Sequence, residues 1–364
     1  MLARGWATVA VTRIKLRIPI PRHVPMRTAA LLAALSATLI AACASTPEVK
    51  APVSVVASTP AAPRVGIALG GGAAKGFAHI GVIKMLEANG IKPVVVSGTS
   101  AGSVVGALYA SGMDAYAMQE KAFALDESKI RDVSLFSGGV VKGQKLQDYV
   151  NELVGGRTLE KMKKPLAVVA TNLANGERTV FVRGNTGQAV RASSSIPGVF
   201  EAVAIGKTHY VDGGLVSPVP VDAARELGAD FVIAVDISSK ADGIASPTSM
   251  LGNVNQSIKI MGGKLGALEL QRADIVIRPK VNDIGPADFA AKNRAILEGE
   301  RAAQAALPQI RARLAALQAG RTAKARQAAD ADAARQRDAE RKARCAQQQG
   351  WLDTLRRDPD CRAD

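Results

Sequence analysis

Short apolar runs rich in β-branched residues alternate along the chain with longer segments of helical periodicity. Four of these runs predict buried strands, at residues 64–69, 94–96, 231–236 and 275–278. The first two are each followed by a predicted helix, over residues 77–89 and 101–110. Two further apolar runs, 166–173 and 178–182, flank Asn175-Gly176, which is a hairpin signal. Strands that alternate with helices in this way indicate an α/β fold with a mainly parallel central sheet.

Glycine-rich turns join the first two predicted strands to their helices. The second turn is Gly98-x-Ser100-x-Gly102, and a sharp change from strand to helix there lifts the serine above the end of the sheet. The two glycines let backbones cross closely, and the hydroxyl lies at a helix N-terminus, where the dipole favours negative charge. The pattern alone also fits a tight turn without chemistry, so the rest of the chain has to decide between the two.

The first turn, from Gly70 to Gly76, has three candidate uses, and the residues oppose two of them. A dinucleotide fingerprint would need glycine where Lys75 stands, and a phosphate-binding P-loop would need Lys-Ser/Thr after Gly76, where Phe77 follows. The remaining use is an oxyanion hole, a preset pair of N–H donors for the tetrahedral intermediate of acyl transfer. We interpret Lys75 itself as a solvated charge at the edge of this loop.

Two kinds of base are available to Ser100. The chain has only three histidines: His23 lies in a segment that we expect to be removed, and His79 is best explained as a structural group. A triad of the α/β-hydrolase order would therefore have to use His209. A serine–aspartate dyad needs no histidine, and Asp212 precedes two glycines that leave room for a ligand. Both options stay open on the residues alone.

The motifs taken together resemble the patatin-like phospholipase family. The resemblance rests on the glycine loop, the GxSxG turn, the Asp-Gly-Gly turn and the block Ala192–Phe200, and it extends from about residue 65 to 314. It implies a three-layer α/β/α fold, Ser100 as nucleophile, Asp212 as base, and hydrolysis of acyl-lipid esters without a metal or another cofactor. It also implies an oxyanion hole formed by Gly70, Gly71, Gly72 and Ala73. The other glycines of these motifs are Gly76, Gly98, Gly102, Gly213 and Gly214.

The serine block before the aspartate, Ser193 to Ser195, has two interpretations. The plainer one is that these serines cap a helix that Pro197 interrupts, and the other is that they line the acyl pocket. The polar stretch 113–143 is either a helical lid over the acyl groove or an ordinary connecting helix.

The N-terminus has the features of an export address. Residues 1–42 form a signal region whose true start is expected at Met26, and an apolar run from Thr28 to Ile40 ends in Ala-Ala-Cys43. This resembles the lipobox of bacterial lipoproteins, in which Cys43 is acylated. Ala44 in place of aspartate resembles outer-membrane sorting, so we expect anchoring to the outer membrane, facing the periplasm. A general secretory signal or a buried cysteine is the alternative. Residues 43–63 are a Pro/Ala-rich tether.

The C-terminus, residues 315–364, is predicted to be a charged, Ala-rich helical tail beyond the catalytic domain at 64–314. Cys345 and Cys361 are the two remaining cysteines, and an exported compartment permits a disulfide between them. Such a bond would disfavour the unfolded chain by about 3 kcal/mol. Two unpaired thiols are the alternative.

Charge and aromatic content bear on the partners. The net charge is +15 and only 4% of residues are aromatic. A basic surface could face anionic phospholipid or nucleic acid, and charge alone does not choose between them. The scarcity of aromatic side chains suits packed α/β layers better than a stacking surface for nucleic acid. We therefore expect an acyl lipid or phospholipid as substrate and the membrane as partner through Cys43. A non-catalytic lipid-binding envelope lipoprotein with the same fold is the other class of function.

Overall fold

The computed structural model describes residues 60–130, 132, 141–238, 250–347 and 361. The predicted signal region, the start at Met26, Cys43 and most of the tether at 43–63 lie outside the described residues. The strands are β1 (Val65–Leu69), β2 (Val95–Thr99), β3 (Leu166–Asn172), β4 (Arg178–Phe181), β5 (Val203–Ile205), β6 (Thr208–Asp212), β7 (Phe231–Val235) and β8 (Ile275–Ile277). The α-helices are α1 (Phe77–Ala88), α2 (Ala101–Ala110), α3 (Ala115–Phe123), α4 (Gln144–Leu153), α5 (Thr186–Ser193), α6 (Val221–Glu226), α7 (Met250–Leu270) and α8 (Lys292–Gln347).

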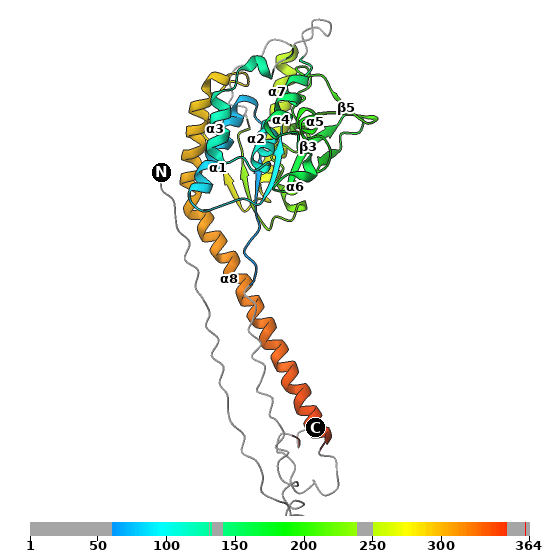
Figure 1. The fold of residues 1–364 in the computed structure, drawn as a ribbon, viewed down its shortest axis with the longest axis vertical. Helices are drawn as coiled ribbons and strands as arrows, with labels where there is room; N and C mark the ends of the chain where they lie inside the picture. Colours follow the sequence, from blue (N-terminus) through cyan, green and yellow to red (C-terminus); the bar gives the residue numbers. More distant parts are fainter. Residues whose placement is uncertain (1–59, 131, 133–140, 239–249, 348–360, 362–364) are drawn as a thin grey trace, which may run out of the picture. The chain divides into compact units, whose positions relative to one another are not determined.

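The described strands form one sheet whose centre is parallel. Its order is β5-β6-β3-β2-β1-β7-β8, and β4 pairs with β3 as the predicted hairpin (Figure 1). The pairs β3–β2, β2–β1, β1–β7 and β7–β8 are parallel, whereas β6 runs antiparallel to β3 and to β5. The predicted α/β class with a mainly parallel sheet is confirmed. Because β1 and β2 are parallel neighbours, the turns that follow them lie at the same end of the sheet.

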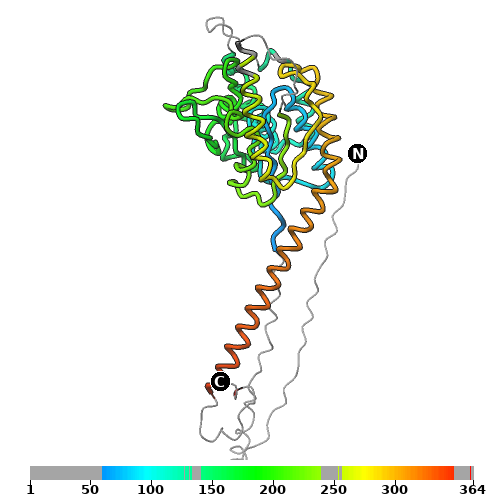
Figure 2. Tube along the Cα trace, turned by 180° about the vertical axis from the view of Figure 1, so that it is seen from behind, coloured from blue at the N-terminus to red at the C-terminus, as the bar shows by residue number. Residues whose placement is uncertain are grey.

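Alternating side chains of β1 divide the core into two layers. Ile67 and Leu69 pack in the larger cluster with α1, α2, α3 and the first part of α8, whereas Ala68 packs on the other face with α6 and with Leu270 of α7. A strand buried on both faces needs a continuous apolar run, which β1 has. Figure 2 shows the two helical layers from behind. Helix α7 has no counterpart among the helices that the sequence predicts.

Helix α8 is longer than the sequence pattern indicates. It runs without a break from Lys292 to Gln347 and so passes the predicted boundary at 314. Its later part is held to the start of the domain, because Gln318 donates to the carbonyl of Pro60 and Arg321 donates to that of Ala61 and pairs with Asp230. Near its end, Cys345 is joined to Cys361 in a disulfide. None of the described helices has the length and apolar character of a membrane-spanning segment.

Helices α1 and α8 touch through a pair of glycines. A Cβ atom added to Gly81 would lie 1.9 Å from the carbonyl oxygen of Ile296, and one added to Gly299 would lie 2.0 Å from that of Ala78. These distances are far below van der Waals contact, so the two backbones approach each other only because both residues lack a side chain.

We predict that Gly299→Ala destabilises the protein by at least about 1–3 kcal/mol, because the added methyl group overpacks this crossing. The matched control is Gly320→Ala in the same helix, where no atom lies within 4 Å of the added Cβ. There the better helix propensity of alanine stabilises by up to about 1 kcal/mol. Thermal melts of the two variants measure the difference, and equal melting temperatures would contradict the close crossing.

Candidate active site

Ser100 lies at a strained turn between β2 and α2. Its φ of 53° is in the left-handed region, and among the described residues the only other non-glycine there is Ala73, with φ 52°. Such strain persists only where the surroundings impose it. A Cβ on Gly102 would lie 2.1 Å from the carbonyl oxygen of Leu69, and one on Gly98 would lie 2.5 Å from that of Gly102. The two glycines therefore permit the crossing that forces Ser100 into this conformation.

The Ser100 hydroxyl donates to Asp212 over 2.6 Å between Oγ and Oδ2. Asp212 is the last residue of β6 and lies opposite Ala170 of β3, which brings it to the level of the turn after β2. Its other oxygen, Oδ1, accepts from the backbone N–H of Gly214 at 2.7 Å. Both side chains are buried. The structure thus brings together the hydroxyl and the carboxylate that the sequence places 112 residues apart.

Burial tunes the carboxyl group of Asp212. Removal from water raises its pKa to about 6, although the hydrogen bonds from Ser100 and Gly214 act in the opposite direction. At neutral pH the group is therefore mostly ionised, yet it holds a proton more readily than an exposed aspartate. That is the behaviour that a general base needs, since its pKa lies near the working pH.

The serine block holds both members of this pair. Ser193 Oγ accepts from the backbone N–H of Ser100 at 2.8 Å and donates to Val169. The carbonyl of Ser195 accepts from the N–H of Asp212 at 2.9 Å. The conformation of Ser100 and Asp212 therefore depends on these bonds.

The same block caps helix α5 at its C-terminal end. Ser194 is the C-cap residue, and Ser195 Oγ donates to the carbonyl of Arg191 at 2.9 Å. The interpretation that these serines cap the helix before Pro197 is therefore confirmed.

The third serine of the block lies at the pocket. Ser194 lines the cavity beside Ser100, and its buried hydroxyl has no hydrogen-bond partner among the described residues. The alternative interpretation, that this block lines the pocket, therefore holds for Ser194 alone.

The glycine loop offers fewer free donors than the sequence analysis expects. The N–H of Gly70 donates to the carbonyl of Val235 and that of Gly71 to Pro218, each at 3.0 Å. These two groups are occupied, which corrects the predicted set of four. In the described part of the chain, the N–H groups of Gly72 and Ala73 have no acceptor. They remain as the candidate donors of this loop beside Ser100.

His79 of α1 supports the glycine loop. It is fully buried, and its Nε2 donates to the carbonyl of Gly70 at 2.8 Å. Burial lowers its pKa to about 4, so the ring is neutral and acts as a structural group, as the sequence predicts.

Lys75 within the loop is only 2% exposed. The interpretation of Lys75 as a solvated charge is therefore wrong.

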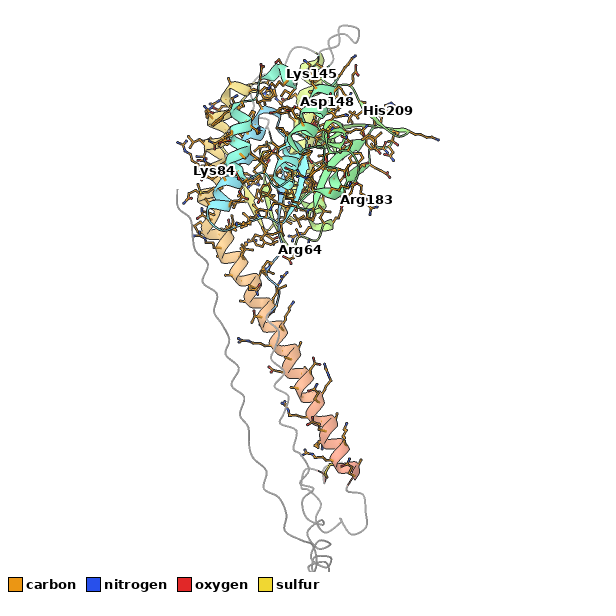
Figure 3. The ribbon with its side chains drawn as sticks, viewed as in Figure 1. Arg64, Lys84, Lys145, Asp148, Arg183 and His209 are labelled. Atoms are coloured by element: carbon orange, nitrogen blue, oxygen red, sulfur yellow. A yellow bond between two sulfur atoms is a disulfide. The ribbon has the colours of Figure 1, made fainter. Side chains whose placement is uncertain are left out.

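His209 lies away from this centre. It is exposed on β6, opposite Ala204 of β5 at the margin of the sheet, and Figure 3 shows it at the periphery of the molecule. The hydroxyl of Ser100 donates to Asp212 and not to a histidine. Nor does the described part of the chain contain a cluster of three or more His, Cys, Asp or Glu that is placed to hold a metal ion.

An apolar cavity of about 410 Å³ opens beside Ser100. One face of α2 lines it through Ala101, Val104, Val105 and Leu108, and Met118 of α3 adds to the wall. At 1.5 Å per residue, the wall from Ser100 to Leu108 is about 12 Å deep. Helix α3, from the stretch considered as a lid, thus forms part of the pocket wall.

Glu269 of α7 is a buried carboxylate that the sequence analysis missed. It accepts from the hydroxyl of Ser217 and from the N–H of Val219. The carbonyls of the same segment hold the site: that of Ser217 accepts from Thr99 Oγ1 and that of Pro218 from Gly71. Glu269 therefore positions the segment on which both turns rest. No sequence motif marks it, because its partners lie about fifty residues away.

We predict that Glu269→Gln removes a pH dependence of stability. Burial raises the pKa of Glu269 to about 7, so the folded protein binds a proton more tightly than the unfolded chain, and stability falls as pH rises from about 4.5 to 7. Glutamine has the shape and hydrogen-bonding pattern of the protonated acid. Urea unfolding measures the free energy of unfolding of both proteins at pH 4.5 and 7.5. The stability of the variant relative to the wild type should be higher at pH 7.5 than at pH 4.5, and an equal difference at the two pH values would contradict this.

Comparisons with known proteins show what the part of the chain that carries this site is similar to. Residues 67–225 match the model described as patatin-like phospholipase. An uncharacterized NTE family protein of Mycobacterium tuberculosis is 35% identical over 197 residues, which are 54% of this chain and 55% of that protein. A lysophospholipase of Debaryomyces hansenii is 28% identical over 257 residues, which are 62% of this chain and 17% of that protein. Over these residues the chain is similar to the patatin-like phospholipase family.

The extent of these likenesses differs. The chain spans about half of the length of the mycobacterial relatives that it matches. Among solved structures, VipD from Legionella pneumophila is similar with a TM-score of 0.46 and 15% identity, over 69% of this chain and 68% of that one.

Proposed function

We propose that this protein hydrolyses the ester bonds of acyl lipids, with Ser100 as nucleophile and Asp212 as general base. The observation that carries the proposal is the 2.6 Å hydrogen bond between Ser100 Oγ and Asp212 Oδ2 beside an apolar cavity. The match of residues 67–225 to a family model described as patatin-like phospholipase, and the similarity to a relative named as a lysophospholipase, support a lipid ester as the substrate class.

In the first half of the proposed reaction, Ser100 Oγ attacks the ester carbonyl while its proton passes to Asp212 Oδ2. The N–H groups of Gly72 and Ala73 face the charge that develops on the carbonyl oxygen, and one such donor contributes about 3 kcal/mol. Asp212 then gives the proton to the leaving alcohol. In the second half, a water gives a proton to Asp212 and attacks the acyl-enzyme, and the released Ser100 oxygen takes that proton back.

The cavity is suited to one acyl chain. Its wall is almost wholly apolar along the length of α2, and each methylene that leaves water for it contributes about 0.8 kcal/mol. Lys121 is the one charged residue among those that line the cavity, and it is exposed, so the charged part of a lipid would stay at the mouth. A single chain in the cavity and a headgroup outside describe a monoacyl or phospholipid ester equally well.

We predict that Ser100→Ala abolishes hydrolysis of a short-chain nitrophenyl ester and that Asp212→Asn lowers kcat/KM by about 10²–10⁴-fold, since it removes the base. The control is His209→Ala, which should retain full activity because this side chain is exposed and remote. Circular dichroism shows whether each variant is folded. Loss of activity in His209→Ala would favour the triad. A wild type that neither hydrolyses esters nor reacts with a fluorophosphonate at Ser100 would favour the non-catalytic lipid-binding lipoprotein.

The pH profile gives a second test of the same dyad. Only the ionised form of Asp212 accepts a proton, and its pKa is about 6. The kcat/KM of the wild type should therefore rise with pH, by about tenfold per unit below 6, and level off above it. A profile that is flat from pH 4.5 to 8 would show that another group is the base.

We further propose that the protein acts in the bacterial envelope, anchored to the outer membrane through acylated Cys43 and facing the periplasm. The support is the sequence Ile40-Ala41-Ala42-Cys43 after a short apolar run, followed by Ala44. Anchoring would keep the enzyme beside its lipid substrate.

The mass of the intact mature protein tests this anchor. We expect a chain that begins at Cys43 and carries the added mass of its acyl chains, and expression of Cys43→Ser should give a protein without that mass. An unmodified mature chain would rule out the anchor while leaving the catalytic proposal unaffected.

A further inference from the structure

Helix α7 exposes an apolar face that no other described part of the chain covers. Ile260, Met261 and Leu268 are 46%, 60% and 55% exposed. At 100° per residue these three side chains lie on one side of the helix, together with Lys264. On the opposite side, Gly266, Glu269 and Leu270 are buried against the domain. The helix thus packs against the domain through one side and exposes a stripe of apolar side chains on the other.

The exposed stripe lies at the active-site end of the sheet. Helix α7 runs back from the end of β7 to the start of β8, and a Cβ on Gly262 would lie 3.6 Å from the carbonyl oxygen of Gly214, in the turn after Asp212. The residues before Gly262, including Ile260 and Met261, therefore project past the level of Asp212. Figure 1 shows the first part of α7 at this end of the domain.

The exposed charges on α7 are positive. Lys259 and Lys264 are exposed, and no acidic residue occurs between 250 and 268. The single carboxylate of the helix, Glu269, is buried and bound to Ser217 and Val219. Lys264 lies within the outward face, whereas Lys259 lies about 100° from Ile260 around the helix. An outward apolar face on a helix whose exposed charges are lysines, without acidic residues, is typical of helices that lie in the headgroup region of an anionic bilayer.

We propose that α7 docks on the surface of a bilayer that contains anionic phospholipid, with Ile260, Met261 and Leu268 entering the interface and the two lysines binding lipid phosphates. This deepens the proposed function, on which it rests, because it names the surface from which the acyl chain enters the cavity. Val199 lines that cavity and is itself 39% exposed, so apolar surface is also exposed at the cavity.

The size of the face favours lipid over a protein partner. A stable protein interface buries about 800 Å² on each side, which takes some 20–30 residues. The α7 stripe offers three large apolar side chains and two lysines. Insertion into a bilayer needs no complementary surface. Each lysine near an anionic membrane raises the affinity by about fivefold, so the two lysines add to the contribution of the apolar side chains.

The test uses a fluorophore that reports its surroundings. Met261→Cys is labelled with an environment-sensitive dye in the full chain, which also carries Cys43→Ser and Ser100→Ala so that neither lipidation nor hydrolysis contributes. The matched control is Leu297→Cys, which is 43% exposed on α8 in the layer on the other face of the sheet. Each protein is mixed with phosphatidylcholine vesicles, with or without about a third phosphatidylglycerol.

We expect the emission of the dye at residue 261 to shift to the blue only with the anionic vesicles, while that at residue 297 stays unchanged. Lys259→Gln with Lys264→Gln should weaken the lipid titration at residue 261 by about 30-fold. An unchanged dye at residue 261 on protein that sediments with the vesicles would overturn the proposal. So would a blue shift that follows protein concentration without vesicles, since it would indicate a second copy as the occupant.

A kinetic experiment separates this proposal from the proposed function. Ile260→Ser with Met261→Ser, in the otherwise natural chain, should leave hydrolysis of a soluble nitrophenyl ester unchanged and lower hydrolysis of vesicle phospholipid by about tenfold or more. Leu297→Ser should change neither rate. Equal loss on both substrates would overturn the docking role, whereas absence of ester hydrolysis in the wild type would overturn the proposed function and leave the fluorescence result standing.

Discussion

The site depends on one close approach between backbones, where the first turns of α2 pass the end of β1. Gly102 lies so near the carbonyl of Leu69 that a methyl group does not fit between them. This contact fixes the direction in which α2 leaves the sheet. It also forces the backbone of Ser100 into the left-handed region. The same contact places the hydroxyl beside the glycine loop that follows β1. Any side chain at Gly102 would separate the two turns, and the hydroxyl of Ser100 would lose both its direction and its neighbours.

A network of buried hydrogen bonds keeps this strained arrangement in place. Ser193 binds the backbone of Ser100, Ser195 binds that of Asp212, and Thr99 binds the segment that Glu269 holds. These residues come from α5, β2 and α7, so the site is supported from both helical layers of the domain. Strain of this kind persists only when the surroundings over-determine the geometry, and here every polar group in the list has a partner.

The parts of the structure that follow local rules were predictable from the sequence. The apolar runs give β1, β2, β7 and β8, and the GxSxG and Asp-Gly-Gly motifs give the two residues that the structure joins. Features that depend on distant partners were not predictable. The use of the Gly70 and Gly71 N–H groups is decided by carbonyls of Val235 and Pro218, more than 140 residues away. Lys75 is buried, whereas its charge alone predicts the opposite. Glu269 belongs to a helix with no clear periodic pattern.

The contact between the start of the domain and α8 has a mechanical consequence. Pro60 and Ala61 are bound by Gln318 and Arg321, and Arg321 also pairs with Asp230, next to the start of β7. A pull on the N-terminal segment is therefore shared by the long helix and by a second strand before it reaches β1. The load is divided at a point remote from Ser100. A force applied at Pro60 and Ala61 is thus carried by contacts that do not include the hydrogen bond between Ser100 and Asp212.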